Sequence, residues 1–76
     1  MNEARRKLLR YARSQLDDVN TIFSQVSSEE SYALSNMPES FEGTDRYEKM
    51  EAAVDALDDI NDCMREIYDS LDEIMY

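Results

Sequence analysis

Two pairs of carboxylates are the residues of this chain whose type and spacing could do chemistry. Glu48 and Glu51 stand three residues apart, and Glu66 and Asp69 repeat that spacing 18 positions further on. Side chains three apart lie on one face of a helix, so each pair offers oxygen ligands of the kind that Mg²⁺ prefers. The chain has no His, one Cys and no Gly-rich phosphate loop, which removes the common nucleophile–base and P-loop arrangements.

These pairs resemble the magnesium-binding pattern of all-α nucleotide pyrophosphohydrolases, which place two such pairs on neighbouring helices around one metal. Here both pairs fall within one helical stretch, and 18 residues at 1.5 Å each separate them by about 27 Å. The pairs therefore cannot share an ion within one chain, and only an antiparallel dimer of these helices could join them. We expect no catalytic residue, no metal and no cofactor, and keep a metal-dependent nucleotide hydrolase as the remote alternative.

An apolar stripe sets the orientation of the helix that carries these acids. From residue 50 to 74, apolar residues recur at alternating spacings of three and four, a heptad pattern typical of packed helices. Apolar neighbours make the stripe wider than one partner helix can cover. The predicted packing and oligomer seam comprises Met50, Ala53, Val54, Leu57, Ile60, Met64, Ile67, Tyr68, Leu71 and Ile74.

The first half of the chain carries a matching but weaker stripe. No Gly or Pro interrupts residues 2–36, so one long helix is expected there, with a separate short helix within 27–41 as the alternative. Its expected seam is Leu9, Ala12, Leu16, Val19, Phe23 and Val26, continued less convincingly by Glu30 and Ala33, with Leu8 and Ile22 widening one side.

The only Pro and the only Gly place a turn at about residues 37–45, followed by a helix at about 46–75. We expect Met37 and Phe41 to fold back against the helix ends. The second helix is predicted to begin at Thr44 or Asp45, with Asp45 and Glu48 forming a variant of the capping box.

The predicted fold is all-α: one antiparallel two-helix hairpin domain over residues 1–76. A chain of this size buries little core, and the single Cys63 excludes an internal disulfide, so oligomerisation remains the way to add core. We predict a homodimer that forms a four-helix bundle, with Met50, Met64 and Tyr68 near the shared surface. The lone Cys and the absence of a long apolar run favour a cytoplasmic protein without a membrane partner.

Charge is distributed unevenly along the chain, whose net charge is −10. Residues 1–16 hold five basic groups and one acidic group, or 5 − 1 = +4, while residues 17–76 hold 3 − 17 = −14. Antiparallel folding would place the basic cluster beside the acidic end of the second helix, so mutual pairing is favoured over an anionic-ligand patch. The basic cluster is Arg5, Arg6, Lys7, Arg10 and Arg13, and the acids opposite are Glu66, Asp69, Asp72 and Glu73.

Carboxylates dominate the outer side of the second helix. We interpret this acidic face as a solubilising surface, and as a possible contact for a basic host protein by nucleic-acid mimicry, since carboxylates about 5–6 Å apart approach phosphate spacing. Direct binding to nucleic acid is disfavoured by the net charge. The acidic face comprises Asp55, Asp58, Asp59, Asp62, Glu66 and Asp69.

The turn and the start of the second helix resemble a family of small acidic helical-hairpin proteins of phages, prophages and their bacterial hosts. The resemblance lies in Glu29-Glu30, in Asn36-Met37-Pro38-Glu39-Ser40 and in the run from Glu48 to Asp59, whereas Thr44 to Tyr47 departs from the family's usual Ser-Glu-Arg-Gly. The family has no assigned activity. The resemblance implies a hairpin fold and a phage or mobile-element context, without a mechanism. We expect a non-catalytic interaction or accessory protein, with an inhibitor that mimics nucleic acid as the alternative.

Overall fold

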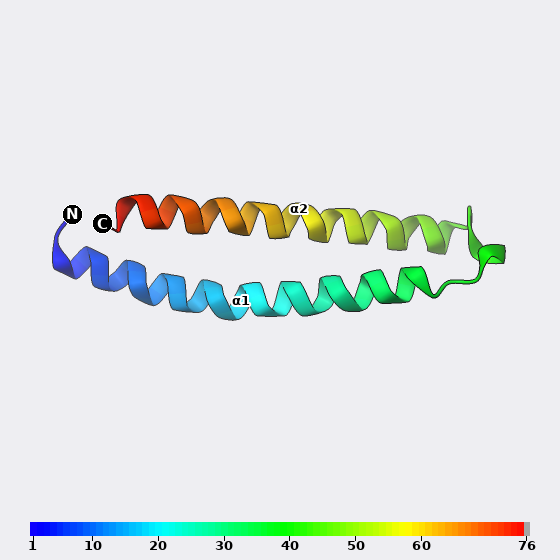
Figure 1. The fold of residues 1–76 in the computed structure, drawn as a ribbon, viewed down its shortest axis with the longest axis horizontal. Coiled ribbons are helices and arrows are strands. Elements are labelled where there is room, and N and C mark those ends of the chain that lie inside the picture. The colour runs from blue at the N-terminus through cyan, green and yellow to red at the C-terminus, as the bar shows by residue number, and fades with distance from the viewer. Residues whose placement is uncertain (76) are drawn as a thin grey trace.

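Two long helices lie antiparallel in the computed structural model, which describes residues 1–75 (Figure 1). Helix α1 spans Glu3–Ser35, a three-residue 3-10 turn η1 spans Glu39–Phe41, and helix α2 spans Asp45–Ile74. The hairpin measures 59 × 16 × 14 Å, and both ends of the chain lie at the end opposite the turn. The all-α hairpin expected from the sequence is confirmed, and every helix end lies within one residue of its expected position.

Helix α1 is continuous because both ends are capped and nothing interrupts it. The side chain of Asn2 accepts a hydrogen bond of 2.9 Å from the backbone N–H of Arg5, which satisfies one free donor of the first turn. At the other end the Asn36 side chain donates to the carbonyl of Tyr32 at 2.7 Å, and Pro38 follows two residues later. Residues 27–35 therefore belong to α1, and the only separate element before residue 41 is the turn η1.

The turn relies on one glycine and one threonine. Gly43 has a φ of +81°, in the left-handed region that other residues rarely adopt. Thr44 then caps α2: its hydroxyl accepts from the backbone N–H of Tyr47 at 3.3 Å and donates to the carbonyl of Phe41 at 2.7 Å. The capping box predicted at Asp45 and Glu48 is therefore wrong, because the threonine one residue earlier takes the cap position.

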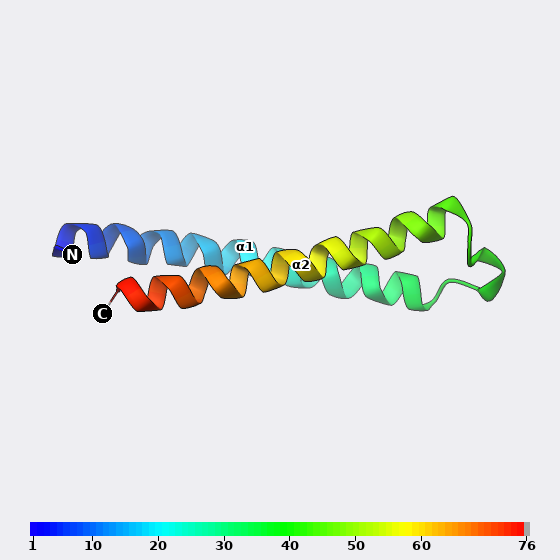
Figure 2. The same ribbon diagram turned by 90° about the horizontal axis from the view of Figure 1, so that it is seen from above.

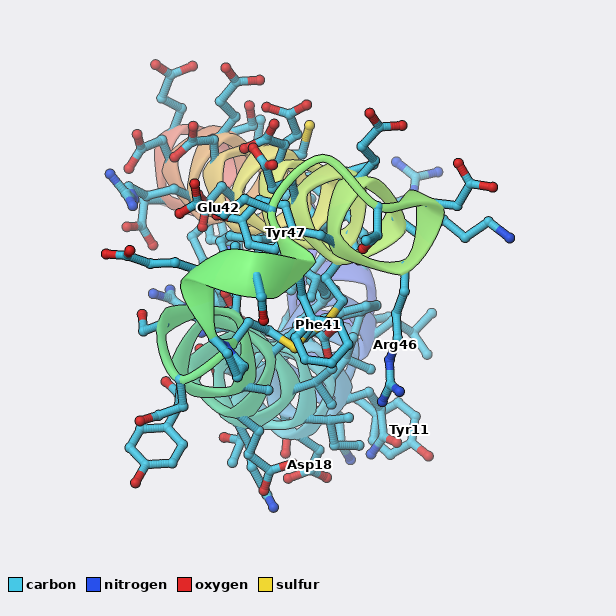
Figure 3. The ribbon with its side chains drawn as sticks, turned by 90° about the vertical axis from the view of Figure 1, so that its right-hand side faces the viewer. Tyr11, Asp18, Phe41, Glu42, Arg46 and Tyr47 are labelled. Carbon is cyan, nitrogen blue, oxygen red and sulfur yellow. The ribbon has the colours of Figure 1, made fainter. Side chains whose placement is uncertain are left out.

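The two hydrophobic residues of the turn differ in burial. Met37 is half-buried, but the side chain of Phe41 is 45% exposed. In the view along the hairpin from its turn end, Phe41 lies at that end of the molecule (Figure 3). Met37 is therefore partly covered, whereas Phe41 keeps close to half of its surface in solvent.

The helices cross at a shallow angle and contact each other along one narrow face each (Figure 2). Within residues 1–75 only Met64, at 7% exposure, and Ser27, at 8%, are buried. On α2 the less exposed residues are Tyr47, Met50, Ala53, Val54, Leu57, Ile60, Asn61, Met64, Tyr68 and Leu71, and on α1 they are Arg6, Leu9, Arg13, Leu16, Asn20, Phe23, Ser27, Glu30, Ser31 and Leu34.

The face that α1 turns to α2 differs from the predicted one. Leu9, Leu16, Phe23 and Glu30 are half-buried as expected, but Ala12, Val19 and Val26 are exposed, as is Ala33. The other half of the contact is made by Arg13, Asn20, Ser27 and Leu34. Helix α1 is therefore rotated about its axis relative to the predicted orientation. In this orientation Asp17 bonds Tyr68 and Arg13 pairs with Asp72.

Three residues expected near the surface shared by two hairpins are at least half-buried within one hairpin. Met50, Met64 and Tyr68 all belong to the contact between α1 and α2 of one chain. Met64 is too buried to meet another molecule. A narrow helix pair covers one stripe only, so the apolar residues left uncovered lie on a different side.

Candidate functional site

One long side of the hairpin is polar and internally bonded. The Tyr68 hydroxyl donates to Asp17 Oδ1 at 2.7 Å, and the Arg13 guanidinium lies 5.6 Å from the centre of the Tyr68 ring. Arg13 Nη1 also lies 2.5 Å from Asp72 Oδ1, so one pair predicted between the basic cluster and the acidic end of α2 is present. The hydrogen bond to Asp17 raises the pKa of Tyr68 above its ordinary value, with desolvation as the next cause. A polar groove on this side is lined by Asn20, Ser24, Asn61, Arg65 and Tyr68.

The rest of the basic cluster pairs mainly within α1. Glu3 accepts from Arg10 at 2.5 Å and lies 3.7 Å from Arg6. The hydrogen bond from Arg10 lowers the pKa of Glu3, and the charge of Arg10 contributes next. Arg5 and Lys7 form no ion pair within residues 1–75. Two cations of the cluster therefore stay available at the start of α1.

The opposite long side of the hairpin is apolar and open. Leu8 is 69% exposed and Ile22 is 60% exposed, so neither side chain packs against the other helix. Val19, Val26, Ile67 and Ile74 are also exposed. We call this surface the apolar strip and define it by Leu8, Ala12, Val19, Ile22 and Val26 of α1 with Ile60, Ile67 and Ile74 of α2.

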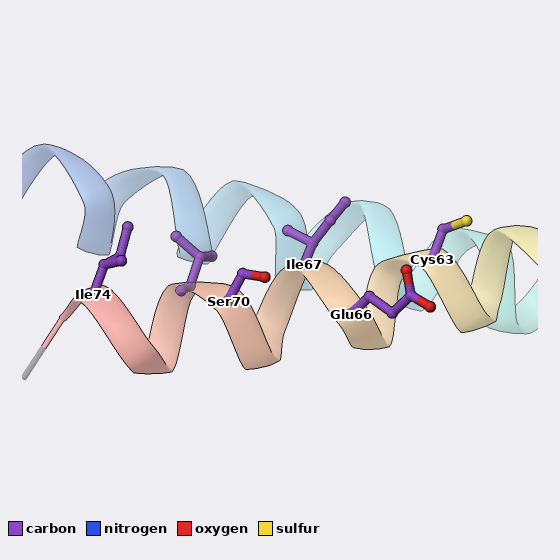
Figure 4. Close-up of a pocket in the computed structure, with 6 residues that line it drawn as sticks. Cys63, Glu66, Ile67, Ser70 and Ile74 are labelled. Carbon is purple, nitrogen blue, oxygen red and sulfur yellow. The ribbon is translucent and has the colours of Figure 1, made fainter.

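Two shallow grooves run along the apolar strip at the end that holds the chain termini. The first is lined by Cys63, Glu66, Ile67, Ser70, Leu71 and Ile74, and Figure 4 shows Ile67 and Ile74 projecting from the same side of α2. The second is lined by Met1, Arg5, Leu8, Leu9 and Ile74. Because Ile74 belongs to both, the grooves form one continuous surface across the two helices. An acid, Glu66, borders it on α2 and a cation, Arg5, borders it on α1.

The predicted acidic face lies on the outside of α2. Its six members, Asp55, Asp58, Asp59, Asp62, Glu66 and Asp69, are all exposed. Carboxylate tips crowd around α2 and point away from α1 in the view along the hairpin (Figure 3). Asp62 pairs with Arg65 at 3.6 Å, both side chains being largely exposed. This surface presents closely spaced negative charge to solvent.

The two carboxylate pairs lie near opposite ends of α2, with Glu48 and Glu51 close to the turn and Glu66 and Asp69 close to the chain terminus. Among residues 1–75 no group of three or more His, Cys, Asp or Glu side chains is arranged to hold a metal ion. Neither α1 nor α2 has the length of apolar sequence needed to cross a membrane.

The predicted seam residues of α2 divide between two surfaces. Met64 is buried and seven members are half-buried, namely Met50, Ala53, Val54, Leu57, Ile60, Tyr68 and Leu71, whereas Ile67 and Ile74 are exposed on the apolar strip. Sequence reasoning did not identify the α1 half of the strip as a separate surface. The sequence did indicate this surface, because Leu8 and Ile22 widen the apolar stripe of the first helix on one side.

No family model, no curated protein and no solved structure matches this chain.

Proposed function

We propose that this chain is a non-catalytic interaction protein that works as a self-associated helical bundle, in the phage or mobile-element setting to which its turn sequence points. The apolar strip is the observation that carries the proposal. Large contiguous exposed apolar patches are rare on monomers and mark surfaces that bind another protein. A second hairpin would cover the strip.

The energetics of one hairpin support the same proposal. Met64 is the only hydrophobic side chain buried within residues 1–75. Small chains that lack disulfides commonly gain the missing core by association. The exposed isoleucines and leucine of the strip would supply that core.

Sedimentation velocity at micromolar concentration tests the proposal. We expect a particle of at least twice the 8.9 kDa chain mass. Ile22→Lys combined with Ile67→Lys places charges in the strip and should reduce the mass to that of the monomer. Tyr32→Lys is the matched control, since Tyr32 is 74% exposed and lies outside the strip. A wild-type protein that stays monomeric would refute self-association.

The acidic face favours a second candidate function, an inhibitor that mimics nucleic acid and binds a basic host protein. Its carboxylates recur along one rigid helix at spacings of about 5–6 Å, comparable with phosphates. Such binding should weaken steeply between 50 and 200 mM salt, by about tenfold or more if several ion pairs form. Biolayer interferometry against a panel of basic nucleic-acid-binding proteins tests it.

The control for this second candidate uses acids elsewhere on the hairpin. Asp58→Lys with Asp62→Lys should abolish salt-sensitive binding, whereas Glu39→Lys with Glu42→Lys at the turn changes the net charge equally and should retain most of it. Equal losses from both double variants would show that net charge alone attracts the partner.

A further inference from the structure

We infer that the apolar strip binds a second copy of this chain whose long axis runs parallel to that of the first, so that α1 of each copy lies against α2 of its partner. This inference rests on the proposed self-association and adds the face and the orientation. Four residues define its centre on each copy: Val19 and Ile22 of α1, and Ile60 and Ile67 of α2.

The strip gives the contact with a second copy its apolar centre. It runs from Leu8 to Val26 of α1, 18 residues or about 27 Å, and with the 14 Å width of the hairpin it offers roughly 380 Å². Each partner in a stable protein complex of standard size buries about 800 Å². A copy that overlaps along the full 59 Å buries the strips of both molecules and adds a polar margin of similar area.

Two-fold symmetry leaves two ways to stack the strips face to face. In the first, the symmetry axis runs along the hairpin, the copies are parallel, and α1 of each lies on α2 of the other. In the second, the axis runs across the hairpin, the copies are antiparallel, and each helix lies on its own counterpart. Both are closed arrangements in which the same patch is used twice.

Charges beside the strip disfavour the antiparallel arrangement. Glu66 borders the groove on α2, and Asp59 and Glu73 lie on the same side of the helix one heptad before and after it. Antiparallel stacking centred on the strip places this acidic row of α2 against the same row of the partner. Like charges that face each other across an interface are unfavourable, and their desolvation adds to the cost.

The parallel arrangement removes this conflict and uses the two cations left over in each chain. Leu8 and Ile74 line one groove, so the start of α1 is level with the end of α2. In a parallel copy these levels coincide, and Arg5 and Lys7 approach the last turns of the partner's α2, where Glu73 lies. The apolar residues also meet in register, since both copies have them at the same height along the bundle.

The position of the strip along the hairpin also favours the parallel arrangement. Its apolar residues end at Val26 in α1 and begin at Ile60 in α2, so the strip occupies the half nearer the chain termini and the middle of the molecule. Antiparallel copies that overlap over their full length would place Leu8 against the acidic stretch around Glu29 and Glu30. Parallel copies place the apolar residues of one strip on those of the other.

Double electron–electron resonance on a spin-labelled protein decides the orientation. The label is attached to Ser40→Cys, an exposed turn position, in a Cys63→Ser background. Parallel copies bring the two labels to the same end, at about 20–35 Å, because neighbouring helices pack about 8–10 Å apart and each label adds a flexible arm. Antiparallel copies hold the labels near or beyond the 59 Å length of the hairpin.

Each outcome separates this inference from the proposed function. A distance near or beyond 59 Å would overturn the parallel arrangement while leaving self-association in place, and the absence of any intermolecular distance would overturn both. Ile67→Lys should abolish the short distance if the strip is the interface, whereas Tyr32→Lys should preserve it. A short distance that survives Ile67→Lys would place the interface on another face.

Discussion

Asn61 lies in the middle of the contact between α1 and α2, and its side-chain oxygen is buried without a hydrogen-bond partner among residues 1–75. A buried amide that lacks a partner costs about 1–3 kcal/mol. A polar residue at such a seam position also opposes a slip of one helix against the other, since the polar groups of both helices must coincide. Asn61 and the nearby Asn20 thus lower the free energy of unfolding but favour one alignment of the two helices.

Asn61→Leu should stabilise the protein by about 1–2 kcal/mol, because the change removes the unsatisfied amide oxygen and adds apolar contact. In a chain of this size the melting temperature should rise by about 4–8 °C for each kcal/mol. Urea denaturation followed by circular dichroism at one fixed protein concentration measures the effect. A lower midpoint for Asn61→Leu would show that the amide is satisfied by water in solution.

Tyr68→Phe should make stability less dependent on pH above about pH 10. The pKa of Tyr68 is raised in the folded protein, so its hydrogen bond to Asp17 stabilises the fold fully below the unfolded pKa and is lost as the pH rises through the folded pKa. The wild type should therefore be more stable than Tyr68→Phe at pH 7, and the difference should shrink above pH 10. Tyr32→Phe, at an exposed tyrosine, is the control, and thermal melts from pH 7 to 11 give the comparison.

At the scale of elements, the turn holds the two helices in their antiparallel order. Gly43 adopts a left-handed conformation between η1 and the cap residue Thr44. No atom lies within 4 Å of the position that a Cβ would occupy at Gly43, so backbone strain is the whole cost of a side chain there. A substitution at Gly43 therefore tests the cost of the left-handed backbone conformation without a steric clash.

Gly43→Ala should destabilise the hairpin by about 1–2 kcal/mol, the cost of the left-handed conformation for a residue with a Cβ. Gly43→Asn should cost less, because asparagine adopts this conformation more readily. Guanidinium denaturation curves of the two variants measure the difference. Equal destabilisation by both would indicate that the larger side chain meets an obstacle in solution, such as the second copy.

At the scale of the whole molecule, the hairpin has one polar side that is bonded within the chain and one apolar side that is open. Two contacts link the helices on the polar side: the hydrogen bond from Tyr68 to Asp17 and the ion pair between Arg13 and Asp72. The apolar strip on the other side has no counterpart within residues 1–75. A molecule with this division is stabilised by whatever covers the strip.

The melting temperature should accordingly rise with protein concentration, because association of folded chains stabilises them by mass action. Each hundredfold increase in concentration above the dissociation constant contributes about 2.7 kcal/mol at most. Differential scanning calorimetry between 5 and 500 µM measures the shift. Ile67→Lys should remove the concentration dependence, and a wild-type melting temperature independent of concentration would contradict the proposed association.

The amino-acid sequence by itself determined the two helices, their lengths and the turn, because helical periodicity and the effects of Pro38 and Gly43 are local properties. It also determined that the helices run antiparallel, since a turn this short leaves no other choice. Leu9, Leu16 and Phe23 were identified as contact residues because they fall on both of the stripes that α1 could have turned to α2.

Only the tertiary structure decided which of those two stripes faces inward. The sequence favoured the stripe with Ala12, Val19 and Val26 on grounds of hydrophobicity, but α1 turns Arg13, Asn20 and Ser27 to α2 instead. The choice depends on partners 51 and 59 residues away, where Tyr68 bonds Asp17 and Asp72 pairs with Arg13. Because those pairings exist only once the helices are side by side, no local pattern could reveal that the apolar strip would be left open.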